Sequence, residues 1–372
     1  MKSAAAYTNK RRVMAEAGNT KVEQIGNIAT NYGPLQPVLP SQASPLTPTA
    51  CGPDFTHYVY FKGCRRIEST NCSDPPINME TIIAGRLNDT GAAINGYGTS
   101  ARFHSLFGII SIDSDTLLLI DRSYQILYKY TISTNYVSVF AGQDGVIGST
   151  NGTTLLNSTF DYINDFTYDS ANKILYVSTN SNIRKIDLNT NTISTFLNSQ
   201  SGYGFSTILY INGFLYGIDP SQSLIYKINV STTSIDIIAG AVSSPKGYVD
   251  GTGSGVRFNT STNKPSILAY DNSTYIYIAD VENNKLRKIN ISTNEVSTVA
   301  NVNNIKMISY NPSDGLIYYL TSTNILYSIN PNNVTAITKI IESSYDIYEF
   351  IVINSTMFYA VANESVLIKI KT

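Results

Sequence analysis

Very few side chains in this chain of 372 residues could perform acid–base or metal chemistry. Its two histidines are His57 and His104, and the sequence around His104 predicts a solvent-exposed loop. Two acids, Asp165 in INDFTYD and Glu349 in DIYEFIV, lie in short apolar segments. Facing carboxylates could hold a metal ion or a water cluster, although hydrogen bonding to backbone amides is the commoner role of buried acids. We therefore expect no catalytic residue, no cofactor and no metal ion.

Three cysteines, Cys51, Cys64 and Cys72, lie close together near the N-terminus. With His57 they could supply four zinc ligands, but their separations exceed the roughly two to four residues between paired ligands of most structural zinc sites. One disulfide with a leftover thiol is expected in an oxidising compartment, and three free thiols in a reducing one. The sequence leaves both states open.

The composition argues against nucleic acid and membranes as partners. Charged residues make up 14% of the chain, against roughly 25% in an average soluble domain. The 26 basic and 27 acidic residues leave a net charge of −1, which provides no positive field for a phosphate backbone. No segment approaches the roughly 20 apolar residues of a membrane span, and the first residues lack the apolar run of a classical signal peptide.

The elements that must position these side chains are short strands. From Met79 onward, segments rich in Ile, Val, Tyr and Thr are separated by turn residues roughly every 8 to 12 positions, which predicts an all-β fold. The segments recur in a fixed order, as repeat proteins require. The fullest unit combines IDIIAG (235–240), GYVDGTGSGVRF (247–258), PSILAYD (265–271) and YIYIADVENNKLRKINIST (275–293).

This unit resembles the NHL repeat, in which a strand ends in Ala-Gly, a Gly-Asp-Gly loop leads to a Phe, and two further strands follow. The resemblance covers about residues 79–372, and later units keep only the strand pair. It implies a β-propeller in which the repeated glycines allow sharp turns and the repeated aspartates accept backbone N–H bonds. We expect Arg102 and Arg257, before the repeated Phe, to pair with loop carboxylates or stack between blades. The repeat positions are Gly85, Gly142, Gly240, Asp121, Asp280, Phe103 and Phe258.

Counting the repeats predicts six blades. Their strands fall near 109–142, 160–198, 206–240, 266–301, 305–340 and 347–371. The sixth unit lacks a fourth strand, whereas METIIAG (79–85) has no unit before it. We therefore predict a six-bladed β-propeller closed by this N-terminal strand, which leaves no blade incomplete. Asp165 and Glu349 then belong to innermost strands, whose residues can face the central channel.

The segments before the propeller differ in kind. Residues 1–50 form a Pro-rich stretch predicted to be an extended arm, because each proline removes a hydrogen-bond donor and favours extended geometry before it. Residues 51–78 form a short cysteine-containing segment, and 79–372 the propeller. We expect the arm to mediate self-assembly or binding to protein partners, and Lys10, Arg11 and Arg12 are either suited to an acidic groove on the partner or a simple solvated basic start.

We expect a non-enzymatic structural or protein-interaction protein. One alternative is a propeller enzyme with a metal at the channel mouth. Another is single-stranded RNA binding, which the resemblance to NHL propellers raises, although most of the 27 tyrosines alternate within strands where packing explains them. The abundance of Asn, Ile and Tyr without Trp is typical of AT-rich genomes, including those of large DNA viruses, and a virion component is our favoured setting.

Overall fold

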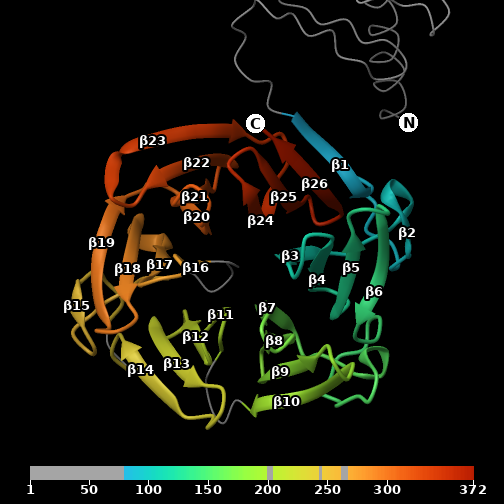
Figure 1. Cartoon of the computed structure of the whole chain (residues 1–372), viewed down its shortest axis with the longest axis horizontal. Coiled ribbons are helices and arrows are strands. Elements are labelled where there is room, and N and C mark those ends of the chain that lie inside the picture. Colours follow the sequence, from blue (N-terminus) through green and yellow to red (C-terminus); the bar gives the residue numbers. More distant parts are fainter. Residues whose placement is uncertain (1–78, 199–203, 243–244, 261–266) are drawn as a thin grey trace, which may run out of the picture. The chain divides into compact units, whose positions relative to one another are not determined.

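Six antiparallel sheets are arranged around a central axis as the blades of a propeller (Figure 1). The computed structural model describes residues 79–198, 204–242, 245–260 and 267–372. Within these residues every long element is a strand, and the three helices are single 3₁₀ turns. The predicted all-β fold and the count of six blades are confirmed. The predictions for His57, the three cysteines and the arm concern residues outside those described.

Each blade runs from an innermost strand at the axis to an outermost strand at the rim. Blade 1 contains β3 (Leu106–Ser111), β4 (Thr116–Asp121), β5 (Ile126–Thr131), β6 (Tyr136–Ala141) and the short β2 (Gly96–Tyr97). Blade 2 contains β7 (Ile163–Asp169), β8 (Ile174–Thr179), β9 (Asn182–Asp187) and β10 (Thr192–Asn198). Blade 3 contains β11 (Thr207–Ile211), β12 (Phe214–Asp219), β13 (Leu224–Asn229) and β14 (Ile235–Ala239).

The second half of the ring repeats this plan. Blade 4 contains β16 (Leu268–Tyr270), β17 (Tyr275–Asp280), β18 (Lys285–Asn290), β19 (Glu295–Asn301) and the short β15 (Gly251–Thr252). Blade 5 contains β20 (Ile305–Asn311), β21 (Leu316–Thr321), β22 (Ile325–Asn330) and β23 (Asn333–Glu342). Blade 6 contains β24 (Ile347–Asn354), β25 (Met357–Ala362), β26 (Val366–Lys371) and β1 (Met79–Gly85).

The ring closes through strands from its two ends. β1 pairs antiparallel with β26, from Met79 opposite Lys371 to Gly85 opposite Val366, so it supplies the outermost strand of blade 6 (Figure 1). The Glu80 carboxylate also accepts a hydrogen bond from the Ser344 amide at 3.0 Å, which links β1 to the end of blade 5. The predicted closure is confirmed, and β1 covers an edge of β26 that would otherwise present unpaired backbone.

The hairpin turns explain much of the asparagine content. Asn135, Asn191, Asn272 and Asn294 adopt left-handed backbone conformations, with φ between 54° and 59°, in turns between neighbouring strands. Asparagine tolerates this region better than most residues because its short side chain can bond to the local backbone. The Asn-rich composition therefore serves the local geometry of the turns between strands.

The core lies between the blades, where aromatic side chains from adjoining segments meet. Phe103 packs edge-on against Tyr128 with ring centroids 5.0 Å apart, and Phe258 is likewise fully buried. Gly85 has φ of 82°, and a Cβ atom there would lie 2.2 Å from the carbonyl oxygen of Ser365. Gly142 and Gly240 occupy the matching positions with φ of 91° and 98°. Glycine at these positions lets the chain leave the outer strand close to its neighbour.

Candidate functional site

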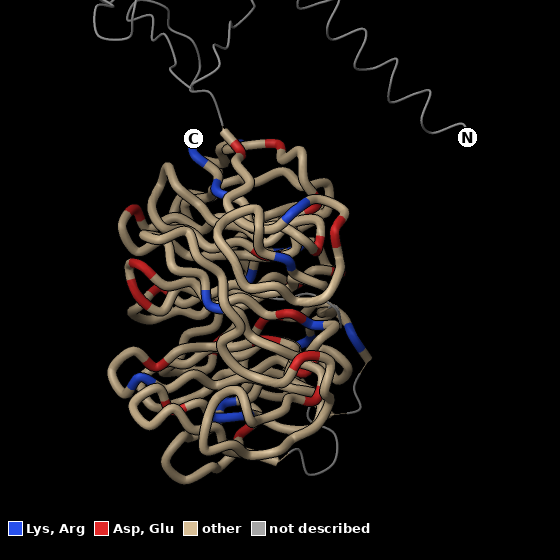
Figure 2. Tube along the Cα trace, turned by 90° about the vertical axis from the view of Figure 1, so that its right-hand side faces the viewer, with Lys and Arg blue, Asp and Glu red and all other residues tan. Residues whose placement is uncertain are grey.

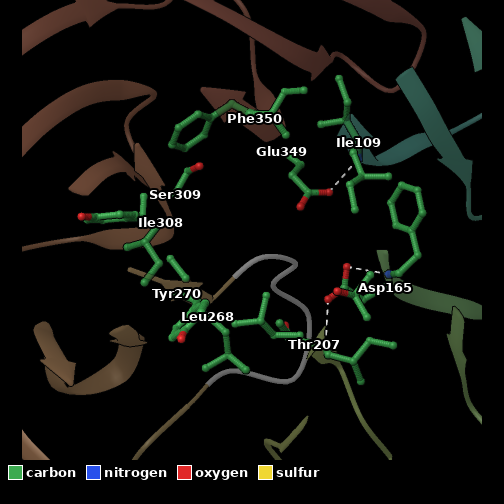
Figure 3. Close-up of a pocket in the computed structure, with 17 residues that line it drawn as sticks. Ile109, Asp165, Thr207, Leu268, Tyr270, Ile308, Ser309, Glu349 and Phe350 are labelled. Carbon is green, nitrogen blue, oxygen red and sulfur yellow. Dashed lines mark hydrogen bonds between the residues drawn. The ribbon is translucent and has the colours of Figure 1, made fainter. Parts of the chain in front are cut away.

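The six innermost strands enclose a cavity of about 210 Å³ on the propeller axis. Most of its wall is apolar, with Ile109, Ile308 and Phe350 among the lining residues. The Asp165 and Glu349 side chains reach into it from β7 and β24 (Figure 3). The structure therefore places both acids on the channel, as the sequence predicts for residues of innermost strands.

A β-bulge precedes each acid and sets the direction of its side chain. The pairing of β7 with β8 shifts register between Ile163 and Asp165, and that of β24 with β25 shifts between Ile347 and Glu349. A bulge re-aims the side chain that follows it and interrupts the ladder locally. The two acids thus occupy equivalent positions in blades 2 and 6, on either side of blade 1.

Each carboxylate connects its own blade to the next one around the ring. Glu349 Oε2 accepts a hydrogen bond from the Ile109 amide of blade 1 at 2.9 Å. Asp165 Oδ2 accepts one from the Ile208 amide of blade 3 at 2.9 Å, and its Oδ1 accepts one from the Phe166 amide at 2.8 Å (Figure 3). These bonds satisfy inner-strand amides that would otherwise face an apolar channel.

The cavity disfavours the charged form of both acids. Burial raises the pKa of Asp165, and the two backbone amides that donate to it oppose this rise. Burial also raises the pKa of Glu349, the negative charge of Asp165 raises it further, and the Ile109 amide opposes both effects. Among the described residues that line the cavity there is no Lys, Arg or His to offset the charge. The environment of Asp165 and Glu349 therefore favours either protonated carboxyl groups or a cation bound between the two carboxylates.

Two small residues complete the surroundings of the acids. Gly108 makes room for Glu349, since a Cβ atom there would lie 3.1 Å from Glu349 Oε2. Thr207 lines the cavity beside Asp165, and its buried hydroxyl has no hydrogen-bond partner among the described residues. Neither was a sequence candidate. Neither residue type indicates a binding site by itself. The one sequence signal for Gly108 and Thr207 is that they lie near the start of innermost strands.

A second cluster, in blade 4, holds the most complete repeat together. Arg287 is fully buried and forms ion pairs with Asp280 at 3.1 Å and Asp250 at 2.8 Å. Its guanidinium carbon also lies 4.5 Å from the centre of the Phe258 ring. Asp280, predicted to accept backbone N–H bonds, accepts one from the Asn259 amide, and its other partners are the Arg287 and Asn283 side chains. This cluster fastens the loop 245–258 onto blade 4.

Asp121 performs the backbone-capping role in blade 1. Its Oδ1 accepts from the Ser123 and Tyr124 amides, both at 3.1 Å, and its Oδ2 accepts from the His104 amide at 2.9 Å. The expectation that His104 is solvent-exposed is wrong. The imidazole is partly buried against Tyr124, with ring centroids 4.0 Å apart, because the loop carrying it is drawn onto blade 1 by Asp121.

The two arginines before the repeated Phe differ in their contacts. Arg102 Nε pairs with Asp89 at 2.6 Å, as the sequence predicts. Both arginines also donate to the carbonyl oxygens three and one residues before them, Arg102 at 2.9 and 2.8 Å and Arg257 at 2.6 and 2.7 Å. The described residues give Arg257 no ion pair, because Asp250 of its own loop pairs with Arg287.

Charges of both signs are scattered over the propeller. In side view, Lys and Arg positions lie interspersed with Asp and Glu positions along the chain trace (Figure 2). Over the part of the chain that the structure describes, no three His, Cys, Asp or Glu side chains form a group that could hold a metal ion. No helix in that same part is long and apolar enough to cross a membrane.

Comparison with known proteins supports the fold and leaves the activity open. No protein family and no curated protein matches the chain. A gluconolactonase of Xanthomonas campestris superposes with a TM-score of 0.51 at 10% identity, over 72% of this chain and 86% of that one. The WD40 β-propeller domain of Doa1 superposes with a TM-score of 0.49 at 10% identity, over 76% of this chain and 96% of that one. The class of protein is thus a six-bladed β-propeller.

Proposed function

We propose that this protein is a non-enzymatic interaction or structural protein, whose propeller binds a protein partner through loops at its rim. Three loops, named here the rim loops, are residues 86–105, 142–162 and 245–258. Each begins beyond the end of an outermost strand and leads towards the innermost strand of the next blade. Each also adds backbone pairing on the outside of that next blade.

The rim loops are held firmly. In the first, β2 pairs with β6 of blade 1, and in the third, β15 pairs with β19 of blade 4. In the second, Gly152 exchanges two backbone hydrogen bonds with Ile193 of blade 2, both at 3.0 Å. Loops fixed in this way present side chains in a defined arrangement, which reduces the ordering cost of binding.

The observation that carries the proposal is where the exposed apolar side chains lie. Nine of the fifteen large exposed hydrophobic residues in the described part of the chain belong to the rim loops, and two of these loops flank blade 1. Apolar surface gathered on rigid loops is typical of protein-binding sites. The nine are Leu87, Ile94, Tyr97, Val146, Ile147, Leu156, Tyr162, Tyr248 and Val249.

The assignment to the NHL type is part of the same proposal. Its support is the cluster of Asp250, Phe258, Asp280 and Arg287, which joins the Gly-Asp-Gly loop, the repeated Phe and the Arg-Lys-Ile strand in one blade. A virion setting, with residues 1–50 as the assembly arm, extends the proposal and rests on the composition and on the Pro-rich sequence.

Footprinting on the assembled protein tests the proposal. Hydroxyl-radical oxidation of the protein isolated from its native assembly would be compared with oxidation of the purified chain. We expect protection at Tyr97, Ile147 and Leu156, with Ile237 on β14 as an exposed control outside the rim loops. Protection confined to the control, or no protection on the rim loops, would contradict the proposed binding surface.

A further inference from the structure

We propose that the axial cavity is a binding site for a small organic cation, an ammonium group on an apolar body, held between Asp165 and Glu349. This site is separate from the rim loops and goes beyond the proposed interaction function. It rests on the cavity, on the acceptors left open inside it and on its uncompensated negative charge.

The acceptors suit an ammonium group in number and type. Glu349 Oε2 and both Asp165 oxygens each accept one backbone N–H bond, and a carboxylate oxygen can accept two. The described residues provide no hydrogen bond to Glu349 Oε1. The Thr207 hydroxyl, on the same cavity wall, is buried and unpartnered among the described residues. A primary ammonium has three N–H donors and no acceptor, so it matches one open oxygen from each of the three side chains.

The balance of charge favours a cation over a neutral ligand. Two carboxylates share a cavity whose described lining contains no basic side chain, and a buried acid without a partner is costly to ionise. A cation between them offsets both desolvation and mutual repulsion. A divalent metal fits less well, because calcium prefers about six to eight oxygen ligands and magnesium a near-octahedral set.

The size and lining of the cavity describe the rest of the ligand. Its volume of about 210 Å³ is below the roughly 300 Å³ at which pockets for drug-sized molecules begin. Ile109, Ile308 and Phe350 form apolar walls. These features indicate a compact body of a few carbon atoms, such as a short alkyl chain, beneath the ammonium group.

Calorimetric titration of the full chain with butylammonium chloride tests the proposal. Butanol, with the same alkyl chain but no charge, and calcium chloride serve as the comparison ligands. We expect one butylammonium ion per chain, with butanol bound at least about tenfold more weakly, as expected for loss of a charged hydrogen bond. No binding of butylammonium, equal binding of butanol, or a calcium ion bound in its place would overturn the proposal.

Three variants locate the site. Glu349→Gln keeps an oxygen for the Ile109 amide but removes the charge, and we expect butylammonium affinity to fall about tenfold or more. Thr207→Val removes only an unpartnered hydroxyl, so the fold is preserved while affinity falls about threefold. Asp236→Asn, on the exposed face of β14, is the control and should bind as wild type does. Equal affinity in all three variants would place the binding elsewhere and refute the site.

Discussion

The Glu349 carboxylate accepts a hydrogen bond at 2.9 Å from the amide of Ile109, 240 positions away in the sequence. The bond joins the innermost strands of the last and first blades, next to the point where β1 and β26 close the ring. Asp165 makes the equivalent bond between blades 2 and 3. The two buried acids thus link neighbouring blades from inside the channel. Ionising them there costs free energy, and this cost depends on pH.

Stability should therefore fall as pH rises. Burial raises the pKa of Asp165 to about 7, and the pKa of Glu349 is raised as well, so the unfolded chain loses these protons first. Below about pH 4 the two acids are protonated in both the folded and the unfolded chain, so they do not reduce stability. Between about pH 4 and 7 they ionise in the unfolded chain first, and the free energy of unfolding declines. Urea unfolding from pH 5 to 8 measures this slope.

Glu349→Gln isolates the contribution of the pair. Burial also raises the pKa values of Asp144 and Asp280, so wild type alone cannot assign the slope. We expect the variant to show a shallower slope and to exceed wild type at pH 8 by on the order of 1 to 3 kcal/mol. A variant with the wild-type slope would show that the acids are not coupled to folding.

Ring closure predicts unequal effects of two N-terminal deletions. Removing residues 79–85 takes away β1 with its buried Ala84 and exposes the edge of β26, and it should lower the melting temperature by roughly 10 °C or more. Removing residues 1–40 should have a much smaller effect. Thermal unfolding followed by circular dichroism compares them, and equal losses would be incompatible with closure by β1.

Arg184 offers a test of the buried ion pair in blade 4. It occupies in β9 the place that Arg287 has in β18, but Thr179 stands where blade 4 has Asp280, and Asn151 where it has Asp250. Arg184 is fully buried, and its Nε and Nη1 lack partners among the described residues. Thr179→Asp gives Arg184 a charged hydrogen bond but loses the bond from the Thr179 hydroxyl to the Asn182 carbonyl, so it should stabilise the protein by about 1 kcal/mol.

The reverse change in blade 4 is the matching experiment. Asp280→Ala leaves the fully buried Arg287 with Asp250 as its remaining acidic partner and its Nη1 one acceptor short, which should cost about 1 to 3 kcal/mol. Asp236→Asn on exposed β14 should change stability by less than about 0.5 kcal/mol. Both are measured by urea unfolding. If Thr179→Asp is destabilising, a carboxylate at this position does not pair with the buried arginine in blade 2 as Asp280 does in blade 4.

We predict no hydrolase, lyase or lactonase turnover and no stoichiometric transition metal on the axis. The acids of the channel each bond to backbone amides, a structural use of their oxygens. Elemental analysis of dialysed protein and assays with lactone and ester substrates test this. Zinc or calcium that survives dialysis and disappears on mutation of Asp165 or Glu349 would contradict it, whereas zinc lost on mutation of Cys64 would not.

The arm is predicted to be an assembly device. Residues 1–50 are polar and Pro-rich, a composition that cannot bury a core of its own. Light scattering with size-exclusion chromatography should find the full-length chain as oligomers or with a larger particle, and a chain starting at Asn78 as a monomer. A monomeric full-length chain whose arm is cut readily by protease would make the arm a simple tail.

Most of the architecture follows from local sequence. Strand-length apolar segments, turn residues and the repeat from Gly240 to Arg287 predict six blades, because each blade is built from neighbouring segments of chain. The orphan METIIAG and the incomplete last unit predict the closing pair by the need to cover an edge. Asp165 and Glu349 were placed on innermost strands by the same count.

The surroundings of these residues were decided only by the tertiary structure. Which amide Glu349 binds, which hydroxyl lines the cavity beside Asp165, and why His104 is partly buried all depend on contacts between different blades. A repeat pattern specifies each strand from its own few residues, so it predicts the order of the blades. Contacts across the channel depend on bulges and packing that bring distant residues within a few ångströms, and nothing local in the sequence records those distances.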